Sequence, residues 1–499
     1  MVRESRWHTG PVRHRGRPVR RQAVARAAEP EHSHRQRWAI IGAGPSGLAA
    51  TRTLTARGLE VDVYESASDV GGLWNIDNPR STVYESAHLI SSRTTTQFAE
   101  FPMPPGTPDY PGHHALRRYF GDYADRFGLR ERIRFDTTVT RLEPLHTASE
   151  DAAPRWRVDF RPTDSDDASA RHSELYDGVI LANGTLAEPS VPELPGSFDG
   201  RVLHTRDYRK ASALTGERVL IVGAGNSGCD IAVDAVHTAA SVDMSVRRGY
   251  YFVPKYLFGK PADTLNEGRP LPRPLKQFLD ARLLRLFTGD PVRFGFPAAD
   301  YKIYESHPIV NTLVLHHAGQ GDVRIRPGLR SVDGDTVTFT DGSTGQYDVI
   351  LLATGYRLDY PFIDREHLNW QGMAPRLYLN IFEPSFRGVY VMGMIEASGI
   401  GWQGRFEQAE LLADYLAAPP EAQAAFRARV QNRPWSDLTA GYRYLALERM
   451  SYYVNKHAYR REVRRQRDRL ARDARRALPV MTHLPAADRT QPHETGARA

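Results

Sequence analysis

Two glycine motifs, 181 positions apart, are the residues in this sequence best suited to holding a ligand. The first reads Gly42-Ala-Gly-Pro-Ser-Gly47 and the second reads Gly223-Ala-Gly-Asn-Ser-Gly228. Each follows a short apolar run and precedes a segment of helical composition, which predicts a strand, a tight turn and a helix. Glycines let the backbone approach a pyrophosphate, and the unpaired N–H groups at the helix start attract its charge. The sequence therefore predicts two dinucleotide sites.

The residues that follow the two motifs differ in charge. Glu65 lies 23 positions after Gly42 and ends a predicted strand, where a carboxylate accepts hydrogen bonds from a ribose diol. Val246 stands at the same offset in the second copy, and Arg247 and Arg248 follow it. Two guanidiniums would bind the 2′-phosphate of NADPH. We therefore predict FAD at the first motif and NADPH at the second; the alternative is that the arginines form a solvated strand end.

A second glycine pair, Gly71-Gly72, precedes Leu73 and Trp74 and would let the backbone approach a flat ligand; Trp74 could also be a core residue. The residues predicted to bind FAD are Gly42, Gly44, Pro45, Ser46, Gly47, Glu65, Gly72, Leu73 and Trp74. Those predicted to bind NADPH are Gly223, Gly225, Asn226, Ser227, Gly228, Arg247 and Arg248.

The pattern of elements predicts an α/β fold with two dinucleotide-binding, Rossmann-like domains, the NADPH domain being inserted in the FAD domain. Apolar periodicity predicts a helix at 114–128, antiparallel strands within 131–183 and a helix at 406–416. The loop at 396–404 would place that last helix's N-terminus at the FAD site. The predicted parts are a disordered basic extension (1–36), the FAD domain (37–190 and 331–416), the NADPH domain (191–330) and a helical extension (417–499). The NADPH domain carries an aromatic-rich insertion at 249–310. In the helical extension, nine arginines at 460–476 predict a solvated helix.

The composition limits the class of protein. Apolar residues make up 41% and charged residues 25%, as in soluble globular proteins. The single cysteine, Cys229, cannot form an internal disulfide or a redox pair. Residues 1–37 hold ten Arg and three Glu, which equals the net charge of +7, so the rest of the chain is balanced and gives no case for nucleic-acid binding. With no apolar run of about 20 residues, we predict a cytoplasmic protein without a transmembrane segment.

Between the two glycine motifs stands Phe198-Asp-Gly-Arg-Val-Leu-His204-Thr-Arg-Asp-Tyr208, which matches the pattern FxGxxxHxxxY. Together with the glycine motifs and Ala353-Thr-Gly-Tyr356, it resembles the flavin-containing monooxygenases from about residue 37 to 416. The related Baeyer–Villiger monooxygenases usually end this pattern in Trp, so Tyr208 favours oxidation of a heteroatom.

The resemblance implies that NADPH reduces FAD, that O2 then forms a C4a-hydroperoxide on the flavin, and that a soft nitrogen or sulfur of a small substrate takes the distal oxygen. Where the family often carries an Asn, residues 89–97 have none; Ser91 and Ser92 are the nearest polar candidates for a catalytic role. His204 is a third candidate, although a buttressing role suits it equally. The missing Asn keeps two alternatives open: Baeyer–Villiger oxygenation of ketones, and an NADPH oxidase or sensor. No metal is expected, because the adjacent His316 and His317 cannot share a helix face.

Overall fold

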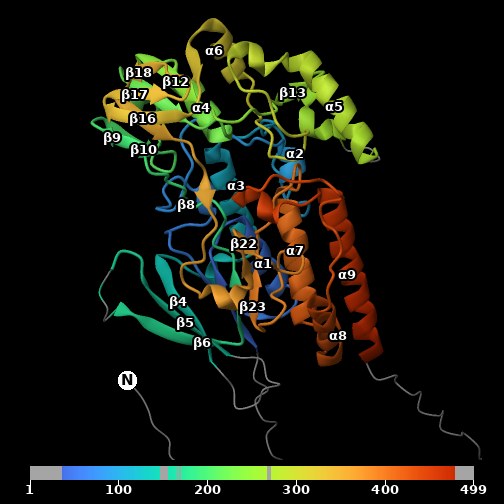
Figure 1. Cartoon of the computed structure of the whole chain (residues 1–499). Helices are drawn as coiled ribbons and strands as arrows, with labels where there is room; N and C mark the ends of the chain where they lie inside the picture. Colours follow the sequence, from blue (N-terminus) through green and yellow to red (C-terminus); the bar gives the residue numbers. More distant parts are fainter. Residues whose placement is uncertain (1–35, 146–154, 166, 168–169, 267–270, 478–499) are drawn as a thin grey trace, which may run out of the picture. The chain divides into compact units, whose positions relative to one another are not determined.

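The computed structural model describes residues 36–145, 155–165, 167, 170–266 and 271–477. Its first sheet is parallel, and its strands come from segments far apart in the sequence (Figure 1). In spatial order these are β23 (Val389–Val391), β7 (Gly178–Leu181), β1 (Arg37–Ile41), β2 (Glu60–Tyr64) and β3 (Ile133–Arg134). Helix α1 (Pro45–Thr55) follows β1 directly, as the first glycine motif predicts.

A second parallel sheet is built around the second glycine motif. Its strands, in spatial order, are β10 (Arg201–His204), β19 (Val349–Leu352), β11 (Arg218–Val222), β12 (Ser241–Ser245) and β15 (Val323–Arg326). Helix α4 (Asn226–Ala235) follows β11, and α6 (Leu313–Gln320) precedes β15. Because β19 lies between β10 and β11, the predicted return to the first domain at residue 331 is too early; the chain leaves the second sheet after Leu352. The two parallel sheets confirm the predicted fold class.

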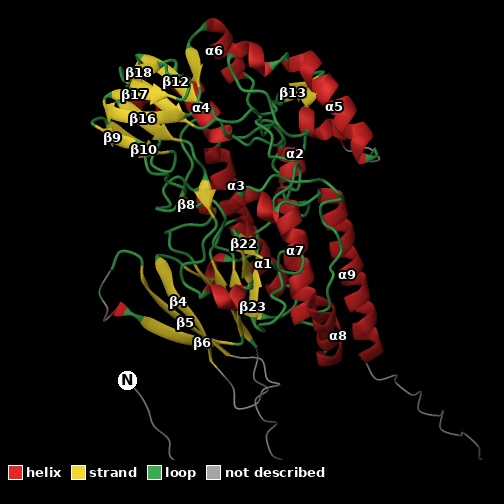
Figure 2. Ribbon diagram, viewed as in Figure 1, coloured by secondary structure: helices red, strands yellow, loops and turns green. Residues whose placement is uncertain are grey.

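Smaller layers flank both sheets (Figure 2); their strands pair antiparallel except for β9, which pairs parallel with β16. The predicted strands within 131–183 are β4 (Thr137–Leu145), β5 (Arg155–Pro162) and β6 (His172–Tyr176), and the predicted helix at 114–128 is α3 (His113–Arg126). Beside the second sheet lie β18 (Thr344–Gln346), β17 (Thr336–Phe339), β16 (Leu329–Gly334) and β9 (Gly196–Phe198). Two-stranded pairs are formed by β8 (Glu188–Pro189) with β20 (Tyr356–Arg357), β13 (Tyr256–Leu257) with β14 (Lys260–Pro261), and β21 (Trp370–Gln371) with β22 (Ala374–Pro375).

Helices α7 (Gly401–Leu416), α8 (Pro420–Gln431) and α9 (Lys456–Ala477) pack together (Figure 1). The expectation of a solvated final helix is wrong for α9, which buries Tyr459, Val463 and Leu470 against the core. Its other face is polar, and Arg467 pairs with Glu410 and Asp414 of α7 at 2.8 and 2.7 Å. The arginines hide this buried face in the sequence, because they outnumber the few apolar residues that form it.

The insertion contains α5 (Arg273–Thr288), and α2 (Arg93–Thr96) is a single turn in the loop at 84–111. Among the residues that the structure describes, no helix is both long and apolar enough to cross a bilayer. The predicted basic extension, apart from Gln36, and residues 478–499 lie outside the described residues.

Candidate functional site

The first glycine turn is closed by contacts that exclude a side chain. A Cβ on Gly47 would lie 1.9 Å from the carbonyl oxygen of Gly42, so helix α1 packs directly on the turn. Gly42 itself has φ +105°, in the left-handed region that favours glycine. Helix α1 begins after Gly44 with no side-chain cap and no acidic residue in its first turn. Its first N–H groups therefore have no capping side chain, as an anion site requires.

Glu65 faces this turn from the end of β2. Its carboxylate accepts hydrogen bonds from the N–H groups of Ala43, at 2.7 Å, and Ala67, at 2.9 Å. Only 4% of the residue is exposed, and burial raises the pKa of the carboxyl group, although both hydrogen bonds oppose that rise. The carboxylate is thus held against the glycine turn, at the position where the sequence predicts a ribose contact, and that contact stays a prediction.

The second glycine pair packs against the same turn. The N–H of Gly71 donates to the carbonyl oxygen of Ala43 at 3.1 Å, and a Cβ on Gly44 would lie 3.4 Å from the Cα of Gly72. Leu73 accepts a hydrogen bond from the Ser81 hydroxyl through its carbonyl oxygen. The structure thus brings Gly72 to the first motif, whereas the side chain of Leu73 packs against the core cluster of the second domain.

Trp74 and Ser46 meet the start of α7. The Trp74 ring packs edge-on against Trp402 in the first turn of α7, with 6.4 Å between ring centroids. A Cβ on Gly393, which follows β23, would lie 2.2 Å from the Ser46 hydroxyl. The N–H of Gly393 in turn donates to the side chain of Gln408 on α7. Helix α7 thus begins at Gly401, five residues before the predicted start, and Trp74 packs against its first turn. The placement of its N-terminus at the FAD site stays a prediction.

The second glycine turn has the same close contact between helix and turn as the first, but the space beside its middle glycine, Gly225, is free. A Cβ on Gly228 would lie 2.4 Å from the carbonyl oxygen of Gly223, whereas a Cβ on Gly225 would meet no heavy atom within 4 Å. Helix α4 also begins without a side-chain cap. Asn226 does not cap it, because its side chain donates to the carbonyl oxygen of Pro308 and accepts from the N–H of Val310, at 3.1 and 2.8 Å.

Arg247 and Arg248 follow β12 in the way the sequence predicts. Val246 is buried, Arg247 is exposed and Arg248 is half-buried, with its Nε 3.8 Å from a carboxylate oxygen of Asp300. The stem of Arg247 packs near Gly328, where an added Cβ would lie 3.2 Å from the arginine Cγ. An exposed guanidinium beside the sheet is available to a phosphate, and the assignment to NADPH stays a prediction.

Ser91 and Ser92 are engaged by other side chains. The N–H and hydroxyl of Ser92 both donate to one carboxylate oxygen of Asp263 in the insertion, at 2.7 and 3.0 Å. The Ser91 hydroxyl is hydrogen-bonded to that of Thr96 at 2.7 Å. Ser92 is buried and fastens the start of α2 to the insertion. The catalytic role that we predicted for the two serines stays a prediction, and these contacts favour a structural one.

His204 and Tyr208 join elements of the second sheet and its helix α4. His204 Nε2 hydrogen-bonds the carbonyl oxygen of Gly355 at 3.1 Å, and its Nδ1 accepts from the N–H of Arg206 at 3.0 Å. Burial lowers the pKa of His204, and a ring whose Nδ1 accepts from an N–H is neutral. The Tyr208 hydroxyl donates to Asp234 on α4 at 3.1 Å. These contacts favour the buttressing role for His204 over the predicted chemical one.

Sequence reasoning missed Asp230, which lies one helical turn after Asn226 on α4. Its carboxylate accepts from the Tyr84 hydroxyl at 3.0 Å and from the side-chain amide of Asn311 at 2.6 Å. Burial raises the pKa of Asp230 and lowers that of the nearby Lys255. The contact with Tyr84 ties the loop at 84–111 to the helix of the second motif. In the sequence, only the spacing of four residues from Asn226 indicates that Asp230 lies on the same helix face as the motif.

A second missed cluster surrounds Glu396, in the loop before α7. Its carboxylate lies 3.2 Å from Arg449 and 3.7 Å from Arg405. Burial acts to raise the pKa of Glu396, but the two guanidiniums outweigh it and hold that pKa below its usual value. His307 hydrogen-bonds the Tyr453 hydroxyl at 3.4 Å, and its buried Nε2 has no hydrogen-bond partner. Burial lowers the pKa of His307 to about 3.

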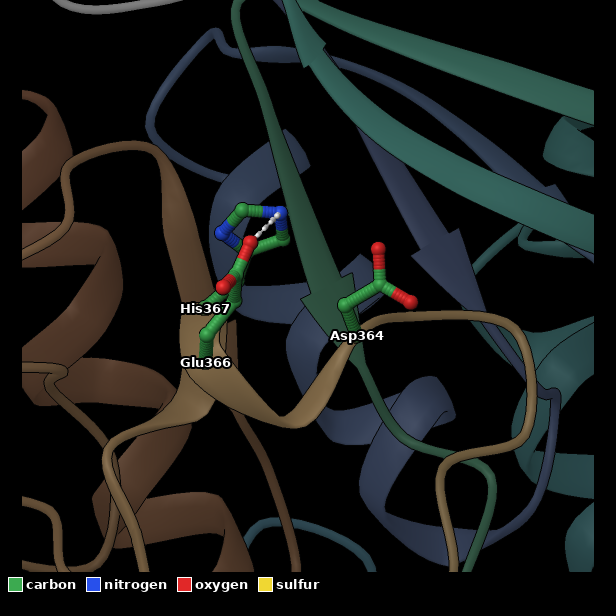
Figure 3. A group of neighbouring side chains, drawn as sticks. All are labelled: Asp364, Glu366 and His367. Atoms are coloured by element: carbon green, nitrogen blue, oxygen red, sulfur yellow. Dashed lines mark ion pairs between the residues drawn. The ribbon is translucent and has the colours of Figure 1, made fainter.

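One group of side chains in the described part of the chain has the residue types of a metal site. Figure 3 shows the Glu366 carboxylate beside the His367 ring, with Asp364 on the same loop. Both Asp364 oxygens already accept from the guanidinium of Arg141, at 2.8 and 2.5 Å, and Glu366 is exposed. Because the arginine balances the carboxylate charge, we assign no metal here. Separately, a cavity of about 500 Å³ lies between the end of α5 and α6, and none of the predicted cofactor residues lines it.

Comparison with known proteins identifies the family of the chain that carries the two glycine turns. The model of the flavin-binding monooxygenase-like family matches residues 35–414, a range that holds both glycine motifs, Glu65, the arginine pair and the FxGxxxHxxxY pattern. The chain belongs to this family. It is an NADPH-dependent flavin monooxygenase, and its cofactors are FAD and NADP(H).

The relatives of this monooxygenase include flavin-containing monooxygenase 5 of Oryctolagus cuniculus, 31% identical over 73% of this chain and 70% of the relative. Two solved structures are similar in fold. Cyclohexanone monooxygenase in an open form has a TM-score of 0.65 at 19% identity, covering 88% of this chain and 98% of that one. S-allyl-L-cysteine S-oxygenase from Allium sativum has a TM-score of 0.58 at 19% identity, covering 88% and 92%.

Proposed function

We propose that this monooxygenase binds FAD at the first glycine turn and NADPH at the second, and uses O2 to oxygenate a soft nitrogen or sulfur in a small organic substrate. One contrast supports the assignment of the two turns. A buried carboxylate, Glu65, faces the first turn, whereas the matching position in the second is the apolar Val246, followed by Arg247 and Arg248. A carboxylate accepts hydrogen bonds from ribose hydroxyls and repels a 2′-phosphate, whereas a guanidinium donates hydrogen bonds to a 2′-phosphate and attracts its charge.

The protein's own part in this reaction is binding, orientation and exclusion of water. The bound flavin, reduced by NADPH, supplies the activation of O2 and the transfer of one oxygen atom. The start of α1 would hold the FAD pyrophosphate and the start of α4 that of NADPH. Asp230 would hold the loop at 84–111 against the second turn through its contact with Tyr84, while His204 and Tyr208 would brace the second domain through Gly355 and Asp234.

The substrate class rests on the family and on Tyr208. The oxygenase from Allium sativum is named for sulfur oxygenation, and the relatives bear the name flavin-containing monooxygenase. A specific observation favours a second candidate, oxygenation of ketones: residues 89–97 carry no Asn, and cyclohexanone monooxygenase has the higher TM-score of the two solved structures compared above.

Product analysis separates these functions. The FAD-loaded protein would be mixed with NADPH and isotopically labelled O2 in the presence of a thioether, a tertiary amine and a cyclic ketone. We expect a labelled sulfoxide or N-oxide formed in proportion to the NADPH consumed. A labelled ester as the main product would establish the second candidate. Consumption of NADPH that yields only hydrogen peroxide with every substrate would refute both and indicate an oxidase or sensor.

A further inference from the structure

A cavity of about 260 Å³ lies between α8 and α9, which are side by side in the helical extension (Figure 1). The residues that line it are all charged: Arg429 of α8, and Arg469, Arg472, Asp473 and Arg476 of α9. Their net charge is +3, and we call the three arginines of α9 the cavity arginines. Sites for drug-sized ligands are mostly apolar and measure about 300–1,000 Å³, so this smaller, basic cavity suits a small anion. It lies beyond residue 414, where the match to the family ends.

The arginines of α9 that face α7 have carboxylate partners, whereas the cavity arginines have none. Arg460 Nε lies 3.0 Å from a carboxylate oxygen of Glu407, and Arg467 contacts two acidic residues of α7 at 2.8 and 2.7 Å. Among the residues that the structure describes, no carboxylate forms an ion pair with a cavity arginine. Three positive charges therefore stand on one side of α9 without a balancing acid.

The one acid of the cavity, Asp473, does not balance these charges, because Arg429 already holds it. Nη1 of Arg429 lies 2.8 Å from the Asp473 carboxylate, and its Nε donates to the side-chain oxygen of Gln466 at 3.2 Å. Nη2 of Arg429 is buried and has no hydrogen-bond partner within the described part of the chain. A buried donor without an acceptor costs stability. The cavity thus combines one fixed guanidinium that lacks an acceptor with three guanidiniums that lack a counter-ion.

The helix dipole does not account for this arrangement. Cations in the last turn of a helix are stabilised by its carbonyl end, which suits Arg476 and also Arg475, a residue that does not line the cavity. Arg469 lies more than two turns before the end of α9, beyond the range of this effect. Spacings of three and four residues place the cavity arginines on one helix face, where like charges repel. Their clustering therefore lowers the stability of α9 unless an anion lies among them.

We propose that this cavity binds a small multivalent phosphate anion, either inorganic or attached to a metabolite. Guanidiniums suit such a ligand because each presents several N–H groups in a plane that matches the oxygens of a phosphoryl group. The cavity arginines would surround the anion, whose charge would cancel their mutual repulsion. None of the residues predicted to bind FAD or NADPH lines the cavity, so the site is separate from the glycine turns and does not depend on the proposed function.

Isothermal titration calorimetry of the full chain tests the proposal, with FAD and NADP in excess so that both glycine turns are occupied. We expect the wild type to bind inorganic pyrophosphate. Arg469→Gln with Arg472→Gln should weaken that binding by about fivefold per arginine, the upper range for an exposed ion pair. The matched control is Arg461→Gln with Arg464→Gln, which removes the same charge from exposed positions of α9 outside the cavity and should bind as the wild type does.

Thermal melting separates lost binding from lost folding. Without pyrophosphate, the variant with Arg469→Gln and Arg472→Gln should melt at the wild-type temperature or slightly above it, because a repulsion between like charges is removed. Excess pyrophosphate should raise the melting temperature of the wild type and of the control, and should change that of the cavity variant less.

Absence of pyrophosphate binding by the wild type, or equally tight binding by the cavity variant, would overturn the proposal. Equal weakening in the control and cavity variants would also overturn it, since the net charge of α9 and not the cavity would then attract the anion. Glucose 6-phosphate, titrated in the same way, distinguishes the two forms of the ligand. Tighter binding than that of pyrophosphate would assign the cavity to a phosphorylated metabolite, and weaker binding would assign it to an inorganic anion.

Discussion

Replacement of Gly225 by alanine separates cofactor contact from folding. Gly225 has φ −70° and ψ 176°, which alanine adopts without strain, and an added Cβ would meet no heavy atom within 4 Å. Gly225→Ala should therefore leave the melting temperature unchanged or slightly raised, since the unfolded chain loses freedom. If the NADPH pyrophosphate binds at this turn, the methyl group would displace it from the N–H groups of α4.

The loss of one or two charge-assisted hydrogen bonds costs about 1.5–3 kcal/mol each, so the KM for NADPH should rise by at least about tenfold. Steady-state NADPH oxidation and thermal melting measure the two effects. Gly121→Ala on α3 is the control, because its Cβ would make only an ordinary 3.6 Å contact with Arg130. Gly228→Ala should instead destabilise the protein, since its Cβ would lie 2.4 Å from a backbone oxygen. An unchanged KM in Gly225→Ala would refute NADPH binding at this turn.

Three further predictions follow from the same geometry. Arg247→Ala with Arg248→Ala should raise the KM for NADPH by about 30-fold or more and that for NADH only slightly, measured from initial rates; equal rises would contradict the 2′-phosphate assignment. Glu65→Gln should weaken FAD binding by about tenfold, seen as a lower flavin-to-protein ratio after gel filtration, and full flavin retention would argue against a ribose contact. Because burial lowers the pKa of His307 to about 3 from 6.5, the unfolded chain takes up a proton first, and stability falls as pH drops below 6.5. In the wild type this proton uptake should lower the free energy of unfolding by about 2 kcal/mol between neutral pH and about pH 5, and His307→Asn should abolish that decrease. Denaturant unfolding at several pH values measures it. An unchanged dependence of the unfolding free energy on pH would show that another group is responsible.

The nucleotide folds could be predicted because local sequence determines them. Gly47 and Gly228 stand where any Cβ would clash with the backbone, so glycine recurs at a fixed spacing in each motif. The strand before each motif and the helix after it are recognisable from their own apolar periodicity. The predicted residues of each motif therefore lie together in the structure. The same reasoning found α3 and the antiparallel strands β4 to β6.

The remaining features depend on contacts between distant segments. Nothing local to Asn226 indicates that its amide would hold the loop at 308–310, more than 80 residues away. Ser92 meets Asp263 across 171 residues, so the sequence shows only a polar side chain and not the partner that engages it. The predicted return at residue 331 is too early because the buried strand at 349–352 would be apolar in either sheet, and periodicity alone does not identify its partner strand.

The chain order of the strands sets a sequence of events during synthesis. All strands of the second sheet have been made by residue 352, but β23, an edge strand of the first sheet, comes only at Val389–Val391. A nascent chain of intermediate length therefore holds one finished nucleotide fold and one whose strand β7 has an unpaired edge. Premature termination between codons 353 and 388 would leave the buried backbone of Gly178–Leu181 open to pairing with other chains, which is a route to aggregation. The fold begun first is thus the one finished last.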